Sequence, residues 1–284
     1  MADQGRSEFA VDLSDRVAVV TGASRGAGRA VAIVLAEAGG TVYGSARTLD
    51  AASATPGREG TLEETAAAAA ARGGLVHPVR CDHTIEADVA GLFERVRHEH
   101  GRLDVLVNNA WGGYEQRTGE PAVPFFDAQF WEQPLWRWDA MFVAGVRAHF
   151  LASRFATPLL RRDRSEHPGL IVHTLAWAFG AFLGNVLYDT AKAATARLAY
   201  GTARQLEPFN IAALALAPGH LGVTETPEYL GRAIAMLAAD PAILVKTGSL
   251  LTVGEVAREY DFTDLDGTQP EPWGLPRLDS PSHG

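Results

Sequence analysis

Short apolar runs, several of them rich in valine and isoleucine, alternate along the chain with longer alanine-rich stretches that favour helices. Each short run is nearly all apolar, which is typical of strands that helices cover on both faces. The alternation predicts an α/β fold, with a doubly wound parallel sheet sandwiched between helices in a single domain. The expected strands are residues 17–20, 41–44, 75–79, 104–107, 170–174 and 211–216.

Two helices are marked by composition. The first is expected over residues 29–38, because Gly39 and Gly40 would end it there. Another is expected over 63–72, where six successive alanines favour a helix. Two stretches interrupt the alternation, namely a loop (51–60) and an aromatic-rich segment (111–138). An N-terminal extension (1–14) and a C-terminal tail (262–284) flank the domain.

The composition, with 47% apolar and 21% charged residues among 284, is ordinary for a soluble globular protein. The net charge of −9 argues against nucleic acid or an anionic membrane surface as a partner, since both favour a basic face. We therefore expect a small-molecule partner. The single cysteine, Cys81, excludes an internal disulfide framework and is expected to be a buried thiol in a reducing compartment. No apolar signal core opens the sequence, so a cytoplasmic location is expected.

A glycine-rich turn, Thr21-Gly22-Ala23-Ser24-Arg25-Gly26-Ala27-Gly28, follows the first expected strand and opens the first helix. Its glycines permit positive φ angles and let the backbone approach a pyrophosphate, while the helix N-terminus supplies free N–H groups. Between a strand and a helix, this turn predicts a dinucleotide-binding site. The expected contacts within it are Gly22, Ser24, Arg25, Gly26 and Gly28.

The charges near the end of the second strand favour NADP(H) as the cofactor. An NAD site usually places an acid about 20 residues after the glycines, to hold the ribose 2′-hydroxyl. This chain has Arg47 there and no acid between Gly44 and Asp50. Arg47 and Arg25 could together hold a 2′-phosphate. The alternative is that both are solvated surface arginines.

Tyr188 and Lys192 are four residues apart on an expected helix and therefore share one face. Because an ammonium favours a nearby phenolate, we expect Lys192 to lower the pKa of Tyr188 from its usual value of about 10. Tyr188 would then serve as a general acid for a ketone or as a base for an alcohol. These two residues are the expected catalytic pair and also part of the cofactor site.

Three motifs together resemble the short-chain dehydrogenase/reductase family. They are the Gly-x-x-x-Gly-x-Gly spacing of the turn, Asn108-Asn109-Ala110 after the fourth strand, and Tyr188-x-x-x-Lys192. The resemblance covers nearly the whole chain and implies a Rossmann-type fold in which Lys192 also binds the nicotinamide ribose. A closer likeness, to the branch of dehydrogenase/reductase family member 1 and its bacterial relatives, is carried by residues 101–110, 257–260 and 264–267.

The resemblance implies further cofactor contacts outside the glycine turn. Asp82 would accept a hydrogen bond from the adenine amino group, and Asn109 would lie near the adenine ribose. Ala110, Pro218 and Gly219 are implied as cofactor contacts too. As bare residues, Asp82 and Asn109 could equally cap a helix or a turn.

The chain departs from the family at three positions of the expected reaction centre. Leu175 stands where the family has a serine that orients the substrate carbonyl, and neither it nor Ala176 can donate a hydrogen bond. Val143 is aligned with the family asparagine, and Val223, followed by Thr224, replaces a threonine that contacts nicotinamide. Losing one oriented donor typically lowers a rate by about 10²–10³-fold, so turnover is expected to weaken without vanishing.

Four polar residues are candidates to replace the missing serine hydroxyl: His220, Thr174, Tyr114 and Asn185. Each also has a structural interpretation, as a loop histidine, a strand-end threonine, a packing tyrosine and a turn asparagine. In a regular strand Thr174 would point away from the face of residue 175. No metal site is expected, because His98 and His100 face different ways on a helix and the other histidines are scattered.

The leading hypothesis is an NADP(H)-dependent oxidoreductase that interconverts a carbonyl and an alcohol, or an imine and an amine, on a moderately apolar small molecule. The aromatic-rich segment would form the substrate wall, and its alternative roles are ordinary core or a subunit interface. The resemblance implies a homodimer or homotetramer built on the helix over 191–206. The alternative functions are non-redox chemistry on the same fold, as in a lyase, isomerase or cyclase, and a non-catalytic NADP-binding regulator.

Overall fold

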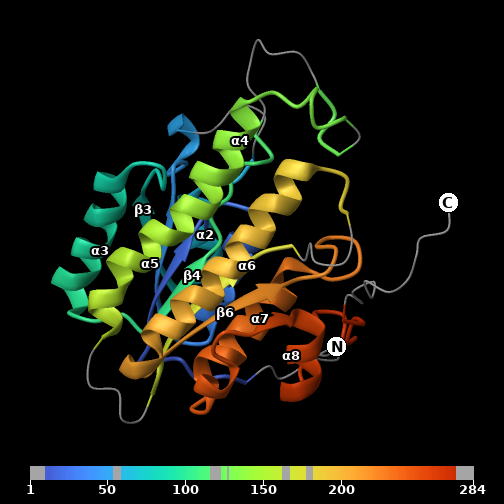
Figure 1. Ribbon diagram of the computed structural model, residues 1–284. Coiled ribbons are helices and arrows are strands. Elements are labelled where there is room, and N and C mark those ends of the chain that lie inside the picture. Colours follow the sequence, from blue (N-terminus) through green and yellow to red (C-terminus); the bar gives the residue numbers. More distant parts are fainter. Residues whose placement is uncertain are drawn as a thin grey trace.

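Seven parallel strands form one sheet in the order β3-β2-β1-β4-β5-β6-β7 (Figure 1). The computed structural model describes residues 10–53, 59–115, 123–126, 128–161, 167–176 and 182–272. The strands are β1 (Val17–Thr21), β2 (Thr41–Ala46), β3 (Leu75–Arg80), β4 (Val105–Asn108), β5 (Gly169–Thr174), β6 (Ile211–Ala217) and β7 (Leu250–Thr252). The first six confirm the expected strands. The sequence does not indicate β7, because three residues are too few to show a pattern.

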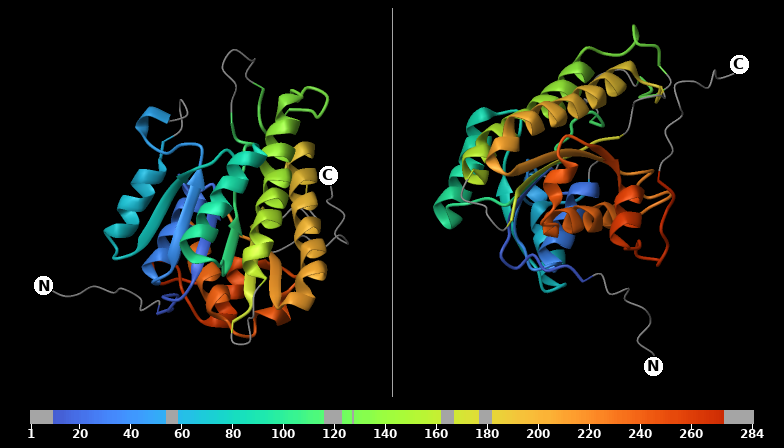
Figure 2. Two further views of the ribbon diagram at one scale, coloured as in Figure 1. Left: turned by 90° about the vertical axis from the view of Figure 1, so that its left-hand side faces the viewer. Right: turned by 60° about the horizontal axis from the view of Figure 1, so that its bottom comes forward.

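Helices cover both faces of the sheet, which confirms the expected layers. α3, α5 and α6 lie over one face, and α1, α2 and α7 lie over the other (Figures 1 and 2). Among the described residues no helix is long and apolar enough to cross a membrane. The helices are α1 (Gly26–Glu37), α2 (Leu62–Ala70), α3 (Glu86–His100), α4 (Trp136–Met141), α5 (Ala148–Leu160), α6 (Val186–Leu206), α7 (Pro227–Ala239) and α8 (Val253–Tyr260), with a π-helical turn at Phe142–Arg147.

Strand side chains alternate between two apolar cores, one on each face of the sheet. The alternation fixes the register, because a slip of one residue would exchange the two sets of side chains. Buried residues that show it in neighbouring strands are Val20, Val107 and Val172 on one face, and Val19, Leu106 and Ile171 on the other.

The strand order reverses between β1 and β4. From β1 the chain proceeds outward to β2 and β3, and from β4 it proceeds the opposite way to β5, β6 and β7. The connections after β1 and β4 therefore diverge, and a crevice forms at the carboxyl ends of these strands. Open α/β sheets bind their ligands at such a point.

The sequence suggests that both terminal segments are peripheral, but each of them contributes a residue to the packed domain. Leu13, in the expected N-terminal extension, is buried in the core. Phe262, at the start of the expected tail, is buried with its ring centroid 5.3 Å from that of Tyr229. Local composition does not reveal these two contacts, because each depends on a surface formed by distant parts of the chain. Residues 1–9 and 273–284 lie outside the described part.

Gly28, in the first turn of α1, packs closely against the backbone of the glycine turn at Gly22. A Cβ at Gly28 would be 2.2 Å from the carbonyl oxygen of Gly22. We predict that Gly28→Ala lowers the free energy of unfolding by about 1–3 kcal/mol, the usual cost of overpacking, as measured by urea denaturation.

Gly91→Ala is the matched control for this prediction. Gly91 lies in α3, and a Cβ there would have no neighbour within 4 Å. This substitution should raise stability by about 0.5–1 kcal/mol through helix propensity alone. If the two variants had the same free energy of unfolding, this would contradict the close packing of α1 against the turn.

Candidate active site

The turn between β1 and α1 has the geometry that its glycines suggest. Gly22 has a φ of +70° and Gly26 a φ of +52°, a region that residues with a Cβ rarely adopt. A Cβ at Gly22 would also lie 3.0 Å from the Cα of Ala110 at the end of β4. Since α1 begins at Gly26, its unpaired first-turn N–H groups lie at this turn.

The ends of β1 and β4 are joined through Thr21. Its hydroxyl oxygen accepts hydrogen bonds from the backbone N–H groups of Asn109 and Ala110, at 2.9 and 3.0 Å. The Nδ2 of Asn109 donates to the carbonyl oxygens of Thr21 and Gly22, at 3.2 and 3.3 Å. The side chain of Asn109 therefore braces the glycine turn, in agreement with the structural alternative for this residue.

A cavity of about 380 Å³ lies beside the glycine turn, at the carboxyl ends of the strands. Gly28 does not line it, because this glycine packs against the backbone of the turn. The other cofactor residues expected in this half of the site do line it, and they are Gly22, Ser24, Arg25, Gly26, Arg47, Asp82, Asn109 and Ala110.

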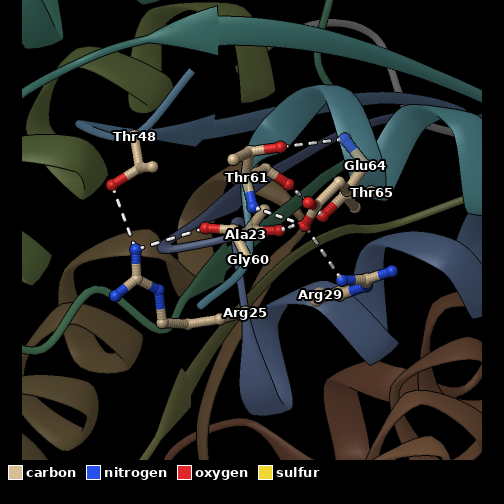
Figure 3. A network of polar contacts seen from close by, with 8 residues as sticks. All are labelled: Ala23, Arg25, Arg29, Thr48, Gly60, Thr61, Glu64 and Thr65. Atoms are coloured by element: carbon tan, nitrogen blue, oxygen red, sulfur yellow. Dashed lines mark hydrogen bonds and ion pairs between the residues drawn. The ribbon is translucent and has the colours of Figure 1, made fainter. Parts of the chain in front are cut away.

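Two arginines lie at the end of β2 in this cavity. The Nη2 of Arg25 donates to the hydroxyl of Thr48 at 3.0 Å and to the carbonyl oxygen of Gly60 at 3.3 Å (Figure 3). Arg47 forms an ion pair with Glu115, a residue that the sequence does not single out. Both guanidinium groups are thus oriented by neighbours at the cavity.

Asp82 and His83 form the part of the cavity that follows β3. The Oδ1 of Asp82 accepts hydrogen bonds from the backbone N–H and the hydroxyl of Thr84, at 2.9 and 2.7 Å, which is an Asx turn. The Nε2 of His83 lies 3.0 Å from the hydroxyl of Ser45, and burial lowers the pKa of His83 to about 4. His83 is therefore neutral at pH 7, and no sequence motif points to it.

A second cavity, of about 630 Å³, brings the expected reaction centre together. Tyr188, Lys192, Pro218 and Gly219 all line it. Apart from these residues its wall is mainly apolar, with Trp111, Phe126, Leu175, Ala176, Leu183, Val223 and Leu230.

The aromatic-rich segment contributes to this wall in part. Trp111, Tyr114 and Phe126 line the cavity, whereas Trp131 and Trp138 are exposed. The role of the segment as a substrate wall stays a prediction, and residues 116–122 and 127 lie outside the described part.

The hydroxyl of Tyr188 lies 3.0 Å from the hydroxyl of Tyr114. Burial raises the pKa of Tyr188 well above its ordinary value, and the neighbouring Tyr114 raises it further. This contradicts the lowered pKa expected from Lys192. The physical reason is that desolvation of the phenolate outweighs the ammonium, whose Nζ lies 5.3 Å from the ring centroid of Tyr188.

Lys192 is buried on α6 with its Nζ 3.5 Å from the centroid of the Trp111 ring. Burial lowers the pKa of Lys192 to about 7. His149, a residue that sequence reasoning missed, lines the same cavity and is neutral, because burial and the nearby His173 lower its pKa. The Nδ1 atoms of the two histidines lie 3.4 Å apart.

The other three candidates for the missing hydroxyl have structural contacts. Thr174 donates to the Oδ1 of Asn109 at 3.2 Å. Asn185 caps α6, where its Oδ1 accepts the backbone N–H of Tyr188 at 3.0 Å. His220 is exposed at the margin of the cavity. Tyr114 is therefore the candidate whose hydroxyl directly meets that of Tyr188.

The structure differs from one sequence-based expectation about side-chain direction. Thr174 and Leu175 both line the second cavity, because β5 ends at Thr174 and the strand alternation stops there. Val143 lines neither cavity. In its π-helical turn, Gly145 is the residue directed at Trp111, since a Cβ there would be 2.7 Å from the indole.

Comparisons with known proteins agree with this geometry. The family model described as short chain dehydrogenase matches residues 16–233. This chain belongs to the short-chain dehydrogenase/reductase family. It is 35% identical to mouse dehydrogenase/reductase SDR family member 1 over 283 residues, which is 90% of this chain and 85% of that protein.

Solved structures of family members share the fold. A short-chain type dehydrogenase/reductase from Mycobacterium marinum is 27% identical with a TM-score of 0.68, over 85% of this chain and 94% of that one. A metagenomic short-chain oxidoreductase in complex with NADP is 26% identical with a TM-score of 0.67, over 84% and 97%. As a short-chain dehydrogenase/reductase, this protein is an oxidoreductase of the class that uses NAD(P)(H) on carbonyl and alcohol groups.

In this short-chain dehydrogenase/reductase, the loop after β6 is held by Glu225. Its Oε1 accepts the backbone N–H of Gly219 at 2.9 Å. Burial raises the pKa of Glu225 to about 7, and the nearby Asp264 also raises it. Glu225 therefore holds the loop after β6 with a buried carboxyl group whose pKa is raised.

We predict that Glu225 makes stability pH-dependent between the ordinary carboxyl pKa of 4.5 and its folded value of about 7. Because the folded pKa is raised, the protonated form contributes stability below this window, and the contribution is lost as pH rises through it. Glu225→Gln keeps an oxygen for the N–H of Gly219 and removes the titration. Urea unfolding of both proteins at several pH values should show the variant gaining stability relative to wild type as pH rises. If the difference in unfolding free energy between the two proteins did not change with pH, the raised pKa of Glu225 would be wrong.

Proposed function

We propose that this protein is an NADP(H)-dependent reductase or dehydrogenase that interconverts a carbonyl and an alcohol, or an imine and an amine, on a moderately apolar small molecule. The observation that carries the proposal is the pair of phenol hydroxyls of Tyr114 and Tyr188, 3.0 Å apart beside Lys192 in an apolar cavity. Such a pair can present two hydrogen-bond donors to one substrate oxygen.

The glycine turn and the two arginines support NADP(H) as the cofactor. The glycine turn lies at the N-terminus of α1, whose first-turn N–H groups would bind the pyrophosphate. Arg25 and Arg47 would hold the 2′-phosphate at the end of β2. When bound, the cofactor supplies or accepts a hydride.

Tyr188 is the proposed acid and base. Its raised pKa keeps the phenol protonated at neutral pH, so it can give its proton to a carbonyl oxygen during reduction. Tyr114 would donate the second hydrogen bond, in the role that Leu175 cannot perform. Lys192 would bind the nicotinamide ribose beside Tyr188.

The cavity wall supports a neutral, apolar substrate. Phe126, Leu183 and Leu230 offer carbon surfaces, and Tyr114 offers a hydroxyl beside that of Tyr188. A ketone or imine with a bulky aliphatic or aromatic group would bury its carbon frame on this wall. We also propose a homo-oligomer in the cytoplasm, with the outer face of α6, where Tyr200 is exposed, at the contact.

Phenylalanine substitutions test the two tyrosines. We predict that Tyr188→Phe lowers kcat for ketone reduction by about 10²–10⁴-fold, through loss of the acid. Tyr114→Phe should lower kcat by about 10²–10³-fold, through loss of one donor. Tyr260→Phe, which removes a hydroxyl on α8 outside both cavities, is the matched control and should keep wild-type kcat. Steady-state assays of NADPH oxidation measure all three, and full activity of Tyr188→Phe would contradict its role.

Substitution of Arg25 tests the cofactor. We predict that Arg25→Ala raises the Kd of NADPH by about 10–100-fold, which corresponds to the loss of one charged hydrogen bond. The Kd of NADH should stay nearly unchanged. Arg95→Ala, on the distant helix α3, is the control. Calorimetric titration with both cofactors checks this, and an equal loss of affinity for both would argue against a 2′-phosphate site.

A further inference from the structure

The indole of Trp111 contacts both residues of the expected catalytic pair. The Nζ of Lys192 is 3.5 Å from its ring centroid, a typical cation–π contact. The ring of Tyr188 meets the indole edge to face, with centroids 5.6 Å apart and an angle of 90°. One side chain therefore contacts both Lys192 and Tyr188.

Two glycines allow the backbone to approach the Trp111 ring closely. A Cβ at Gly113 would be 2.6 Å from the Cζ2 of Trp111, and a Cβ at Gly145 would be 2.7 Å from its Cε3. Gly145 approaches because it lies in the π-helical turn between α4 and α5. Two glycines from distant parts of the chain thus form a slot for the indole.

The contact with Lys192 is made by the face of the ring. The Nε1 of Trp111 is buried and has no hydrogen-bond partner among the described residues. Within the same part of the chain no carboxylate forms an ion pair with Lys192. The titratable side chains that face the ammonium are Tyr188 and the neutral His149.

We propose that Trp111 is a positioning residue, which holds the ammonium of Lys192 beside Tyr188 by a cation–π interaction in the slot between Gly113 and Gly145. The proposal rests on the proposed function, because it assigns Lys192 to the reaction centre. Its physical basis is that a buried ammonium without a carboxylate needs a compensating interaction. The negative face of an indole supplies one.

Lysine titration tests the proposal directly, because Lys192 and Lys246 are the only lysines of the chain. Isotopically labelled lysine gives one NMR signal for each ammonium, and Lys246, paired with Glu259, is the internal reference. We predict that Trp111→Leu lowers the pKa of Lys192 by about one unit, and Trp111→Phe by less, because leucine lacks a π face and phenylalanine has a weaker one. Trp131→Leu, at an exposed tryptophan, should leave it unchanged.

The sign of the shift decides the outcome. If the indole only kept water out, its removal would admit water and raise the pKa of Lys192, so a raised or unchanged pKa overturns the proposal. Gly145→Ala gives an independent test, because the added methyl should displace the ring and lower the pKa of Lys192 while Trp111 is retained. The titration needs neither substrate nor turnover. An inactive enzyme with the predicted shift would therefore refute the proposed function and leave the role of Trp111 intact.

Discussion

The hydrogen bonds of the Thr21 hydroxyl hold together the carboxyl ends of β1 and β4, on which the site depends. They fix the end of β4 against the end of β1, at the point where the strand order reverses. Asn109 extends this connection to the glycine turn and, through Thr174, to the end of β5. Both cavities lie at these strand ends. The same hydrogen bonds therefore set the position of the first cavity relative to the second.

Burial then determines the chemistry of the reaction centre. The same desolvation that raises the pKa of Tyr188 lowers that of Lys192, so each group is driven towards its neutral form. A neutral phenol suits proton donation to a carbonyl oxygen. The hydroxyl of Tyr114 and the indole of Trp111 also contact this pair of residues.

The layers, six strands and the glycine turn could be predicted from the sequence, because each is encoded by neighbouring residues. For the reaction centre, the sequence indicated the Tyr188/Lys192 spacing and named Tyr114 as one of four candidate donors, but it did not indicate which of the four meets Tyr188. Tyr114 lies 74 residues from Tyr188, and no local pattern links the two. The sequence predicted a lowered pKa for Tyr188, whereas burial raises it. The burial of Tyr188 depends on all the side chains that form the cavity wall, which no local pattern reveals. The contact of Gly145 with Trp111 depends on a π-helical turn that helix periodicity does not reveal.

The most direct test of hydride chemistry at this site follows the hydride itself. NADPH carrying deuterium at both positions of the nicotinamide C4 is incubated with the protein and a set of apolar ketones, and the products are analysed by mass spectrometry. The account predicts an alcohol with one deuterium on the carbinol carbon and an equal amount of oxidised cofactor. A product without deuterium, formed while the absorbance of NADPH stays constant, would contradict it and indicate non-redox chemistry on this fold.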